Sequence, residues 1–304
     1  MTDVSVIYVN WNSAREILAS VASVRQRTAG VSFEIIVVDN ASAEGVEPLV
    51  RRDISLIRNQ RNAGFGAGCN IGARHATGEF LLFLNPDTML LNDALSILMA
   101  FMRGRPQCGA AGPLTREQDG AILFGAGRAL PSLWREFLEH STLTFRFPGN
   151  RIAGMPYYSF WDHCSTREVE ALQGSCMMFR KEVFDRIGEF DERFFLYYEE
   201  TDLCKRLRDA GLKVFYVHDA EILHTGKRST TKRYKTVDVM VFRYFESAWC
   251  YFVKHNGLPY ALAWRAMVAG MYLLRYLLHR KSVYLYYCLW AGGYRRAIKP
   301  DQEM

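Results

Sequence analysis

The chain has 304 residues, of which 49% are hydrophobic, 23% charged and 13% aromatic. This composition excludes intrinsically disordered and fibrous proteins and predicts a globular protein with a substantial core. The net charge is +6, but residues 225–299 carry 14 Lys and Arg against 2 Asp and Glu, so the remainder of the chain is acidic.

The first 112 residues alternate short apolar runs with helical patterns. Strands are predicted at 4–9, 34–38, 54–57 and 80–84, and helices are predicted after Ser13 and over 95–102. The apolar runs do not alternate with polar residues, which is typical of parallel strands covered on both faces. With right-handed crossovers, this βαβ series predicts an α/β fold with an open, mostly parallel sheet and flanking helices.

Polar residues follow each predicted strand at its carboxyl end. In open α/β sheets, ligands bind outside these ends, at a switch point in the strand order. One such cluster alone is explained by turns and helix caps, which favour Asn and Asp. Four clusters together favour a ligand site, and they are Asn10-Trp11-Asn12, Asp39-Asn40, Asn59 with Asn62, and Asn85-Pro86-Asp87.

The second half of the chain is less regular at first. Prolines interrupt helical patterns throughout residues 113–170, which we interpret as an insertion that covers the cleft. The apolar stretch 170–179 contains Gly174-Ser175 and predicts a strand that another group approaches closely. Helices are predicted at about 181–187 and from the acidic residues near 200 to a stop at Gly211.

Three acidic residues, Glu199, Glu200 and Asp202, stand at the start of that last helix, directly after an aromatic run. The helix dipole favours acids at this position, which is a purely structural explanation. The functional explanation is that an aromatic wall excludes water and raises the pKa of a carboxylate toward the range of a general base. The cluster is therefore a candidate catalytic site.

Asp87 and His224 are candidate metal ligands. Asp87 follows a buried strand, where a carboxylate can meet a divalent cation that holds a diphosphate, and oxygen ligands suit Mg²⁺ or Mn²⁺. His224 ends the apolar run 220–223 and is a second candidate ligand. A structural role for His224 stays open, as does the competing candidate His218.

The glycine-rich stretch 64–68 resembles a dinucleotide-binding fingerprint only superficially. It lacks the G-x-G-x-x-G spacing, which argues against a Rossmann dehydrogenase. The sequence also contains no Walker lysine motif and no G-x-S-x-G elbow.

In this order and spacing, the motifs resemble the inverting glycosyltransferase family 2, and within it the bacterial rhamnosyltransferases. They span about residues 3–228. The family's Asp-x-Asp signature departs here in its first acid, which is Asn85, and the position of the catalytic base carries Glu instead of Asp. The matching residues are Val4-Ser5-Val6-Ile7 with Asn12, Val37-Val38-Asp39-Asn40-Ala41-Ser42, the glycine-rich segment Asn62 to Gly72, Leu84-Asn85-Pro86-Asp87, and Tyr198-Glu199-Glu200-Thr201-Asp202-Leu203-Cys204 with Arg206.

The resemblance implies a GT-A fold and a nucleotide-sugar donor whose pyrimidine base is hydrogen-bonded by Asp39. It implies that Glu200 is the catalytic base and that Asp87 and His224 bind Mg²⁺ or Mn²⁺. We expect the acceptor to contact Gly174, Ser175, Tyr198 and Glu199. The expected donor-binding residues are Val9, Asn10, Trp11, Asp39, Asn62, Gly64, Asn70, Asn85 and Lys227.

The C-terminal part is rich in aromatic and aliphatic residues, but no apolar run reaches the length of a membrane-spanning helix. Arg265, Tyr272 and His279 lie a heptad apart, which predicts a helix lying in the headgroup plane of an anionic membrane. The alternative is a helical subdomain that packs on the catalytic body or on a second copy in a homodimer. We therefore expect a GT-A catalytic domain at 1–235 and a membrane-associating or oligomerising helical segment at 236–304.

The expected activity is inverting, metal-dependent transfer of L-rhamnose from dTDP-rhamnose to a cell-envelope polysaccharide or polyprenyl-linked glycan. Three alternatives stay open: a UDP-sugar-dependent galactosyl or glucosyl transferase, a sugar-nucleotidyltransferase, and a non-catalytic nucleotide-sugar-binding membrane scaffold. No nucleic-acid partner is expected, because the basic segment is apolar and aromatic.

Location is predicted from the cysteines and the N-terminus. The seven cysteines contain no C-x-x-C pair or disulfide spacing, which favours a reducing compartment. The N-terminus lacks the basic and long apolar regions of a signal peptide. We therefore expect a cytoplasmic protein, peripheral on the inner face of the plasma membrane.

Overall fold

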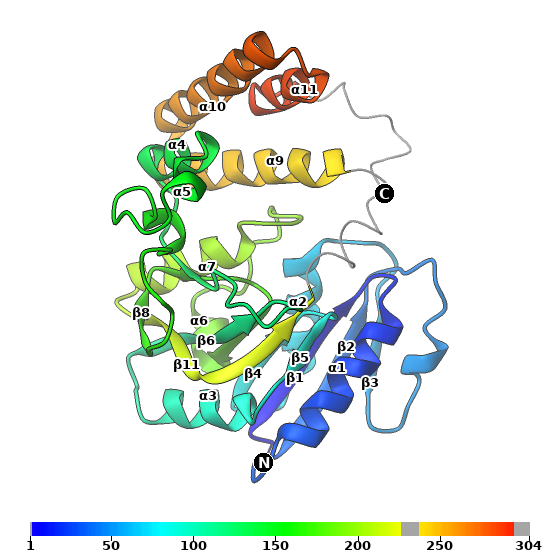
Figure 1. Ribbon diagram of the computed structural model, residues 1–304. Coiled ribbons are helices and arrows are strands. Elements are labelled where there is room, and N and C mark those ends of the chain that lie inside the picture. Colours follow the sequence, from blue (N-terminus) through cyan, green and yellow to red (C-terminus); the bar gives the residue numbers. More distant parts are fainter. Residues whose placement is uncertain (1, 226–236, 295–304) are drawn as a thin grey trace.

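The computed structural model describes residues 2–225 and 237–294, shown as coloured ribbon in Figure 1. Its centre is one continuous sheet with the strand order β3-β2-β1-β4-β10-β6-β11-β5, and β8 pairs with β11. The strands are β1 Val4–Asn10, β2 Phe33–Asp39, β3 Ser55–Arg58, β4 Phe80–Leu84, β5 Thr88–Leu90, β6 Cys108–Arg116, β8 Arg167–Val169, β10 Cys176–Arg180 and β11 Lys213–His224, while β7 Gly127–Arg128 and β9 Ala171–Leu172 form a small separate sheet.

The first four strands are parallel, as predicted. β1 lies between β2 and β4, so the strand order reverses there, which is where open α/β sheets bind ligands. β10 enters antiparallel between β4 and β6, and β11 then runs parallel to β6. The α/β class with a mostly parallel sheet is thus confirmed, with antiparallel strands in its second half.

Helices cover both faces of the sheet. On one face, α1 and α3 bury the apolar positions that the 3.6-residue spacing indicates, such as Ile17, Val21 and Leu98. On the other face, α2, α6 and α7 pack over β1, β4 and β10. The helices are α1 Ala14–Arg27, α2 Phe65–His75, α3 Ala94–Arg103, α4 Leu133–His140, α5 Leu143–Arg146, α6 Lys181–Arg186, α7 Glu199–Asp209, α9 Val237–Asn256, α10 Leu258–His279 and α11 Ser282–Ala291, with short 3-10 turns η1 Glu47–Leu49 and η2 Met155–Tyr157.

The insertion begins later than the prolines suggest. Pro113 does not end a regular element but lies inside the buried strand β6. It pairs with Val217 of β11, at the point where the register shifts before Glu221. A bulge of this kind tolerates the missing proline N–H, so the strand continues to Arg116. The irregular segment then runs through α4, α5 and η2 and returns to the sheet at β8.

The C-terminal helices pack on this body, on the side away from the N-terminus in Figure 1. Their core joins Phe194 and Tyr198, which precede α7, to Phe252 of α9 and Trp264 of α10. A hydroxyl of Ser247 in α9 also donates to the carbonyl of Leu196 at 2.8 Å. In the described part of the chain, no helix is both long and apolar enough to cross a bilayer.

The prediction for the membrane-facing side of α10 is wrong in two of its three residues. Arg265 lies over the ring of Trp249, 3.5 Å from its centroid, and the hydroxyl of Tyr272 lies 3.3 Å from His140 Nδ1. Both side chains therefore contact protein, because the buried stripe of α10 runs along the same side through Trp264 and Val268. The large exposed apolar residues of α10 are Leu258, Leu262, Leu273, Leu274, Leu277 and Leu278.

Candidate active site

The carboxyl ends of β1 and β2 form the first part of the site. Asn10 donates from its side-chain amide to Asp39 Oδ1 at 2.8 Å, and the Ser42 hydroxyl donates to the same oxygen at 2.6 Å. Asn10 and Asp39 end paired, adjacent strands and are almost fully buried. Since both contacts fall on Oδ1, the carboxylate is held in a fixed orientation. Val9 precedes Asn10 in the core, and Trp11 follows it at the surface of the same edge.

The loop that precedes α2 adjoins this pair through Asn40, which the sequence places in the polar cluster after β2 but not among the expected donor-binding residues. The Asn40 amide donates to Asn62 Oδ1 and to the Gly64 carbonyl, both at 2.9 Å. Gly64 has φ +93°, and a Cβ there would lie 2.4 Å from the carbonyl oxygen of Phe195. Only glycine fits this close approach, which ties the loop to the segment before the acidic cluster.

Asn70 lies apart from the Asn10–Asp39 pair. It is buried in α2, where its amide donates to the Phe190 carbonyl at 2.9 Å and accepts from the Phe190 N–H at 2.9 Å. The geometry gives Asn70 the function of holding α2 against the loop that leads to α7.

Asp87 and His224 come together, although 137 positions separate them in the sequence. His224 ends β11, which pairs with β5 just after Asp87, and His224 Nε2 lies 3.4 Å from Asp87 Oδ1. Asp87 is buried and His224 is mostly so. In the described part of the chain, no group of three His, Cys, Asp or Glu side chains is placed to hold a metal ion. His218 instead faces the carbonyl of His163, at 3.2 Å from Nδ1.

A buried carboxylate and an imidazole suit a divalent cation whose remaining positions are filled by phosphate oxygens and water, as Mg²⁺ commonly is in phosphate-binding sites. The residues therefore fit a metal that arrives with a diphosphate. Asn85 lies next to this pair, and its backbone N–H donates to the Ser175 carbonyl at 2.9 Å. Lys227 lies outside the described residues.

Glu200 lies in the first turn of α7, and its side chain is only 9% exposed. Arg128 of β7 donates to Glu200 Oε1 at 2.9 Å and to the Thr201 hydroxyl at 2.8 Å. Gly174 faces Glu200, because a Cβ built there lies 3.7 Å from the Glu200 side chain. Arg128 was not predicted, since 72 positions separate it from Glu200 and no local pattern marks it.

The neighbouring acceptor candidates point elsewhere. Glu199 lies against α2 near Gly66, and burial together with the charge of Glu200 raises the pKa of Glu199 well above its usual value. The sequence predicts a raised pKa for a carboxylate of this cluster, and the structure shows one at Glu199. The Tyr198 hydroxyl donates to Glu136 at 3.0 Å and lies 3.2 Å from the Tyr244 hydroxyl. Ser175 stays beside Asn85, near the strand ends.

Tyr197 and Tyr198 both have the left-handed backbone conformation, with φ of 68° and 67°. This conformation is strained for bulky residues and is concentrated at functional sites. The strained pair immediately precedes Glu199 and Glu200, so it sets the direction in which α7 begins.

These features define a sugar-transferring enzyme of the GT-A class, and the comparisons with known proteins agree. The profile of the family described as "Glycosyl transferase family 2" matches residues 5–188, and the chain belongs to this family. The chain is 31% identical over 248 residues to the N-acetylglucosaminyl-diphospho-decaprenol L-rhamnosyltransferase of Mycobacterium tuberculosis. This alignment covers 76% of this chain and 78% of the relative.

Two further similarities support this assignment. The rhamnosyltransferase WbbL of Escherichia coli is 29% identical over 176 residues, or 55% of this chain and 63% of its own. The mannosyltransferase PcManGT from Pyrobaculum calidifontis, solved with GDP-Man and Mn²⁺, superposes with a TM-score of 0.56 at 16% identity, over 96% of this chain and 88% of its own. At that identity the likeness concerns the fold.

Proposed function

We propose that the protein transfers L-rhamnose from dTDP-rhamnose, with inversion at the anomeric carbon, to a polyprenyl-linked glycan or cell-envelope polysaccharide. The observation that carries this proposal is the Glu200 carboxylate, buried beside Arg128 at the start of α7. The choice of sugar and of a lipid-linked acceptor is supported by the names of the rhamnosyltransferase relatives.

In this reaction one proton is transferred, one bond forms and one bond breaks. Glu200 accepts the proton of an acceptor hydroxyl while that oxygen forms a bond to the anomeric carbon. The bond from this carbon to the diphosphate oxygen breaks on the opposite face, which inverts the configuration. Arg128 keeps the carboxylate oriented for this proton transfer, since it donates to one of its oxygens. Acceptor contacts are assigned to Gly174, which faces Glu200, and to Ser175, whose carbonyl accepts the N–H of Asn85.

The donor is assigned to the strand ends. Asp39, fixed by Asn10 and Ser42, accepts an N–H of the pyrimidine base, and the 62–64 loop borders the nucleoside. Asp87 and His224 would hold Mg²⁺ or Mn²⁺ with the diphosphate. Such a cation, when bound, neutralises negative charge on the departing nucleoside diphosphate.

The test is donor binding and hydrolysis across dTDP-rhamnose, UDP-sugars and GDP-sugars, each with Mg²⁺, Mn²⁺ or EDTA. We expect selection of dTDP-rhamnose and loss of turnover with EDTA. Preference for a UDP-sugar would refute the choice of sugar and leave the mechanism, whereas release of pyrophosphate from a nucleoside triphosphate would indicate a nucleotidyltransferase. A protein that binds the donor without turning it over with any acceptor would be the non-catalytic scaffold.

Transfer is assigned to residues 1–235, and contact with the inner face of the plasma membrane to 236–304. The exposed leucines at the end of α10 lie beside the exposed residues Arg280 and Lys281, a combination suited to an anionic lipid surface. The measurement is sedimentation with anionic liposomes, in which Leu278→Asp should weaken binding. Val50→Asp, which changes an apolar residue 62% exposed on the catalytic body, is the control and should not. Unchanged sedimentation of both variants, or a stable dimer that buries α10, would contradict the assignment.

A further inference from the structure

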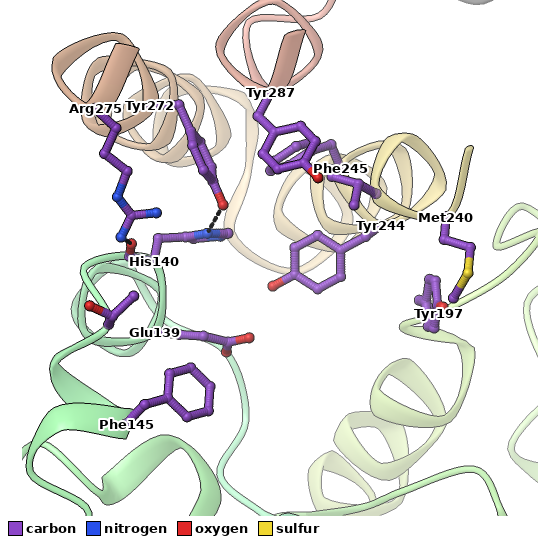
Figure 2. A pocket seen from close by; sticks show the side chains of 12 residues that line it. Glu139, His140, Phe145, Tyr197, Met240, Tyr244, Phe245, Tyr272, Arg275 and Tyr287 are labelled. Atoms are coloured by element: carbon purple, nitrogen blue, oxygen red, sulfur yellow. Dashed lines mark hydrogen bonds between the residues drawn. The ribbon is translucent and has the colours of Figure 1, made fainter. Parts of the chain in front are cut away.

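A cavity of about 410 Å³ lies between the helices of the 113–170 segment and the C-terminal helices (Figure 2). Aromatic rings from separate parts of the chain surround it: Phe145 of α5, Tyr197 before α7, Tyr244 and Phe245 of α9, Tyr272 of α10 and Tyr287 of α11. Protein interiors are close-packed, so a preformed aromatic cavity of this size is typical of a ligand pocket.

The polar groups of this cavity are largely engaged within the protein. The Tyr272 hydroxyl lies 3.3 Å from His140 Nδ1, and the Arg275 guanidinium donates to the His140 carbonyl (Figure 2). Glu139 accepts the hydroxyl of Tyr157 at 2.5 Å. The surface offered to a ligand therefore consists mainly of ring faces with Met240 and Val241, which suits a hydrocarbon chain.

The aromatic cavity has a neighbour that borders the arginine bound to Glu200. A second, narrower cavity of about 70 Å³ shares Glu139 and Tyr244 with it. The narrower cavity is also lined by Arg128, whose guanidinium donates to Glu200. The two cavities are therefore neighbours, and the narrower one borders the arginine that binds the Glu200 carboxylate.

At its other end, the aromatic cavity reaches the outer surface. Phe145 lines it and is nevertheless 64% exposed. On α10, Tyr272 and Arg275 line the cavity, while Leu274 and Leu278 of the same turns are exposed. The cavity is therefore accessible from the surface at Phe145.

We propose that the aromatic cavity binds the isoprenoid chain of a lipid-linked acceptor while the acceptor sugar lies at Glu200. This inference rests on the proposed function and adds the residues that recognise the lipid. The chain lies against Met240, Tyr244 and Phe145, with its distal end toward the surface at Phe145. The cavity thereby favours acceptors with a lipid chain over the same sugar without one.

The first experiment measures binding of farnesyl diphosphate to the full chain by calorimetry, with inorganic pyrophosphate as the probe without a chain. Phe145→Ala, at an exposed position, should weaken farnesyl diphosphate binding about fivefold through the lost ring contact. Met240→Trp, which fills the cavity, should weaken it about tenfold or more. Phe147→Ala is the matched control, because Phe147 is 53% exposed and does not line the cavity. None of these three variants should change pyrophosphate binding.

Equal binding by Phe145→Ala and the wild type would overturn the proposal, as would an equal loss with Phe147→Ala. The second experiment compares KM for a sugar diphosphate linked to two isoprene units with KM for its methyl analogue. If Phe145→Ala raises both KM values equally, the cavity recognises the sugar diphosphate and not the lipid chain, which would overturn the proposal. Variant-sensitive farnesyl diphosphate binding without any rhamnosyl transfer would support the cavity and refute the proposed function instead.

Discussion

The side chain of Asp202 allows a quantitative test of what holds α7, the helix that carries Glu200, against α9. Its carboxylate is fully buried and contacts two cationic side chains and an imidazole: Arg206 Nε at 2.8 Å, Lys254 Nζ at 2.6 Å and His255 Nε2 at 2.7 Å. Arg206 belongs to α7 itself, whereas Lys254 and His255 belong to α9. Asp202→Asn keeps the shape of the side chain and removes the charge that joins the two helices.

Removing one partner of a buried ionic network costs about 3–5 kcal/mol. Asn retains one acceptor oxygen, so we expect about 3 kcal/mol at pH 7, the lower end of that range. For a chain of this size, each kcal/mol lowers Tm by about 2 °C, which predicts a decrease of about 6 °C. Asp209→Asn is the matched control: it removes a carboxylate of the same helix, 55% exposed and paired with Lys205. Such surface pairs contribute about 0.3–0.5 kcal/mol, or about 1 °C.

The pH dependence of this difference follows from the direction of the pKa shift. Burial alone would raise the pKa of Asp202, but the His255 hydrogen bond and the charges of Arg206 and Lys254 outweigh burial and hold this pKa below its usual value. The stabilisation by a carboxylate with a lowered pKa is complete above its unfolded pKa of about 3.9 and is lost as pH falls through the folded value.

The assay is thermal unfolding followed by circular dichroism from pH 8 to pH 3. The difference in Tm between wild type and Asp202→Asn should be constant at neutral pH and decrease below about pH 4. A Tm for Asp202→Asn within 1 °C of the wild type at pH 7, or a difference that persists unchanged at pH 3, would refute the reasoning.

Further variants test the base, the metal pair and the donor loop. Glu200→Gln should lower kcat by about 10²–10⁴-fold and leave the donor Kd nearly unchanged. Glu199→Gln should lower kcat far less. Similar kcat values for the two variants would show that Glu200 is not the catalytic base. Asp87→Asn should raise the Mn²⁺ concentration needed for half-maximal turnover by about tenfold or more, and an unchanged requirement in a metal titration would contradict the assignment. Gly64→Ala should lower Tm more than Gly30→Ala, because both glycines have positive φ but only Gly64 has a neighbouring carbonyl where the new Cβ would lie. Equal decreases in Tm would show that the close contact has no effect.

Much of the sheet could be predicted because its signal is local. β1, β2 and β4 are continuous apolar runs, and parallel strands buried on both faces require such runs. The continuation of β6 through Pro113 could not be predicted, because the bulge that tolerates the proline is formed by β11, about 100 residues later. The orientation of α10 failed for a similar reason. Its heptad residues identify one side of the helix, but only the packing partners decide whether that side meets protein or solvent.

In the candidate site, too, local features could be predicted and contacts between distant segments could not. The convergence of Asn10, Asp39 and Asp87 follows from the rule that parallel strands place their carboxyl ends at one edge. Pairing of Asp87 with His224 depends on β5 and β11, and pairing of Glu200 with Arg128 depends on a two-residue strand in the insertion. Neither pairing has a signature within its own segment of sequence.

Glu136 of α4 determines which parts of this protein can be exchanged with those of a relative. This single buried carboxylate accepts hydrogen bonds from Tyr198 before α7 at 3.0 Å, from Trp264 of α10 at 2.9 Å and from Tyr244 of α9 at 3.5 Å. A graft that replaces only the 113–170 segment leaves these donors without their acceptor, and a graft of only the C-terminal helices removes two of the three donors to the buried charge. The two segments are therefore one module in chimeric enzymes, and a recombination point between them separates groups that stabilise each other.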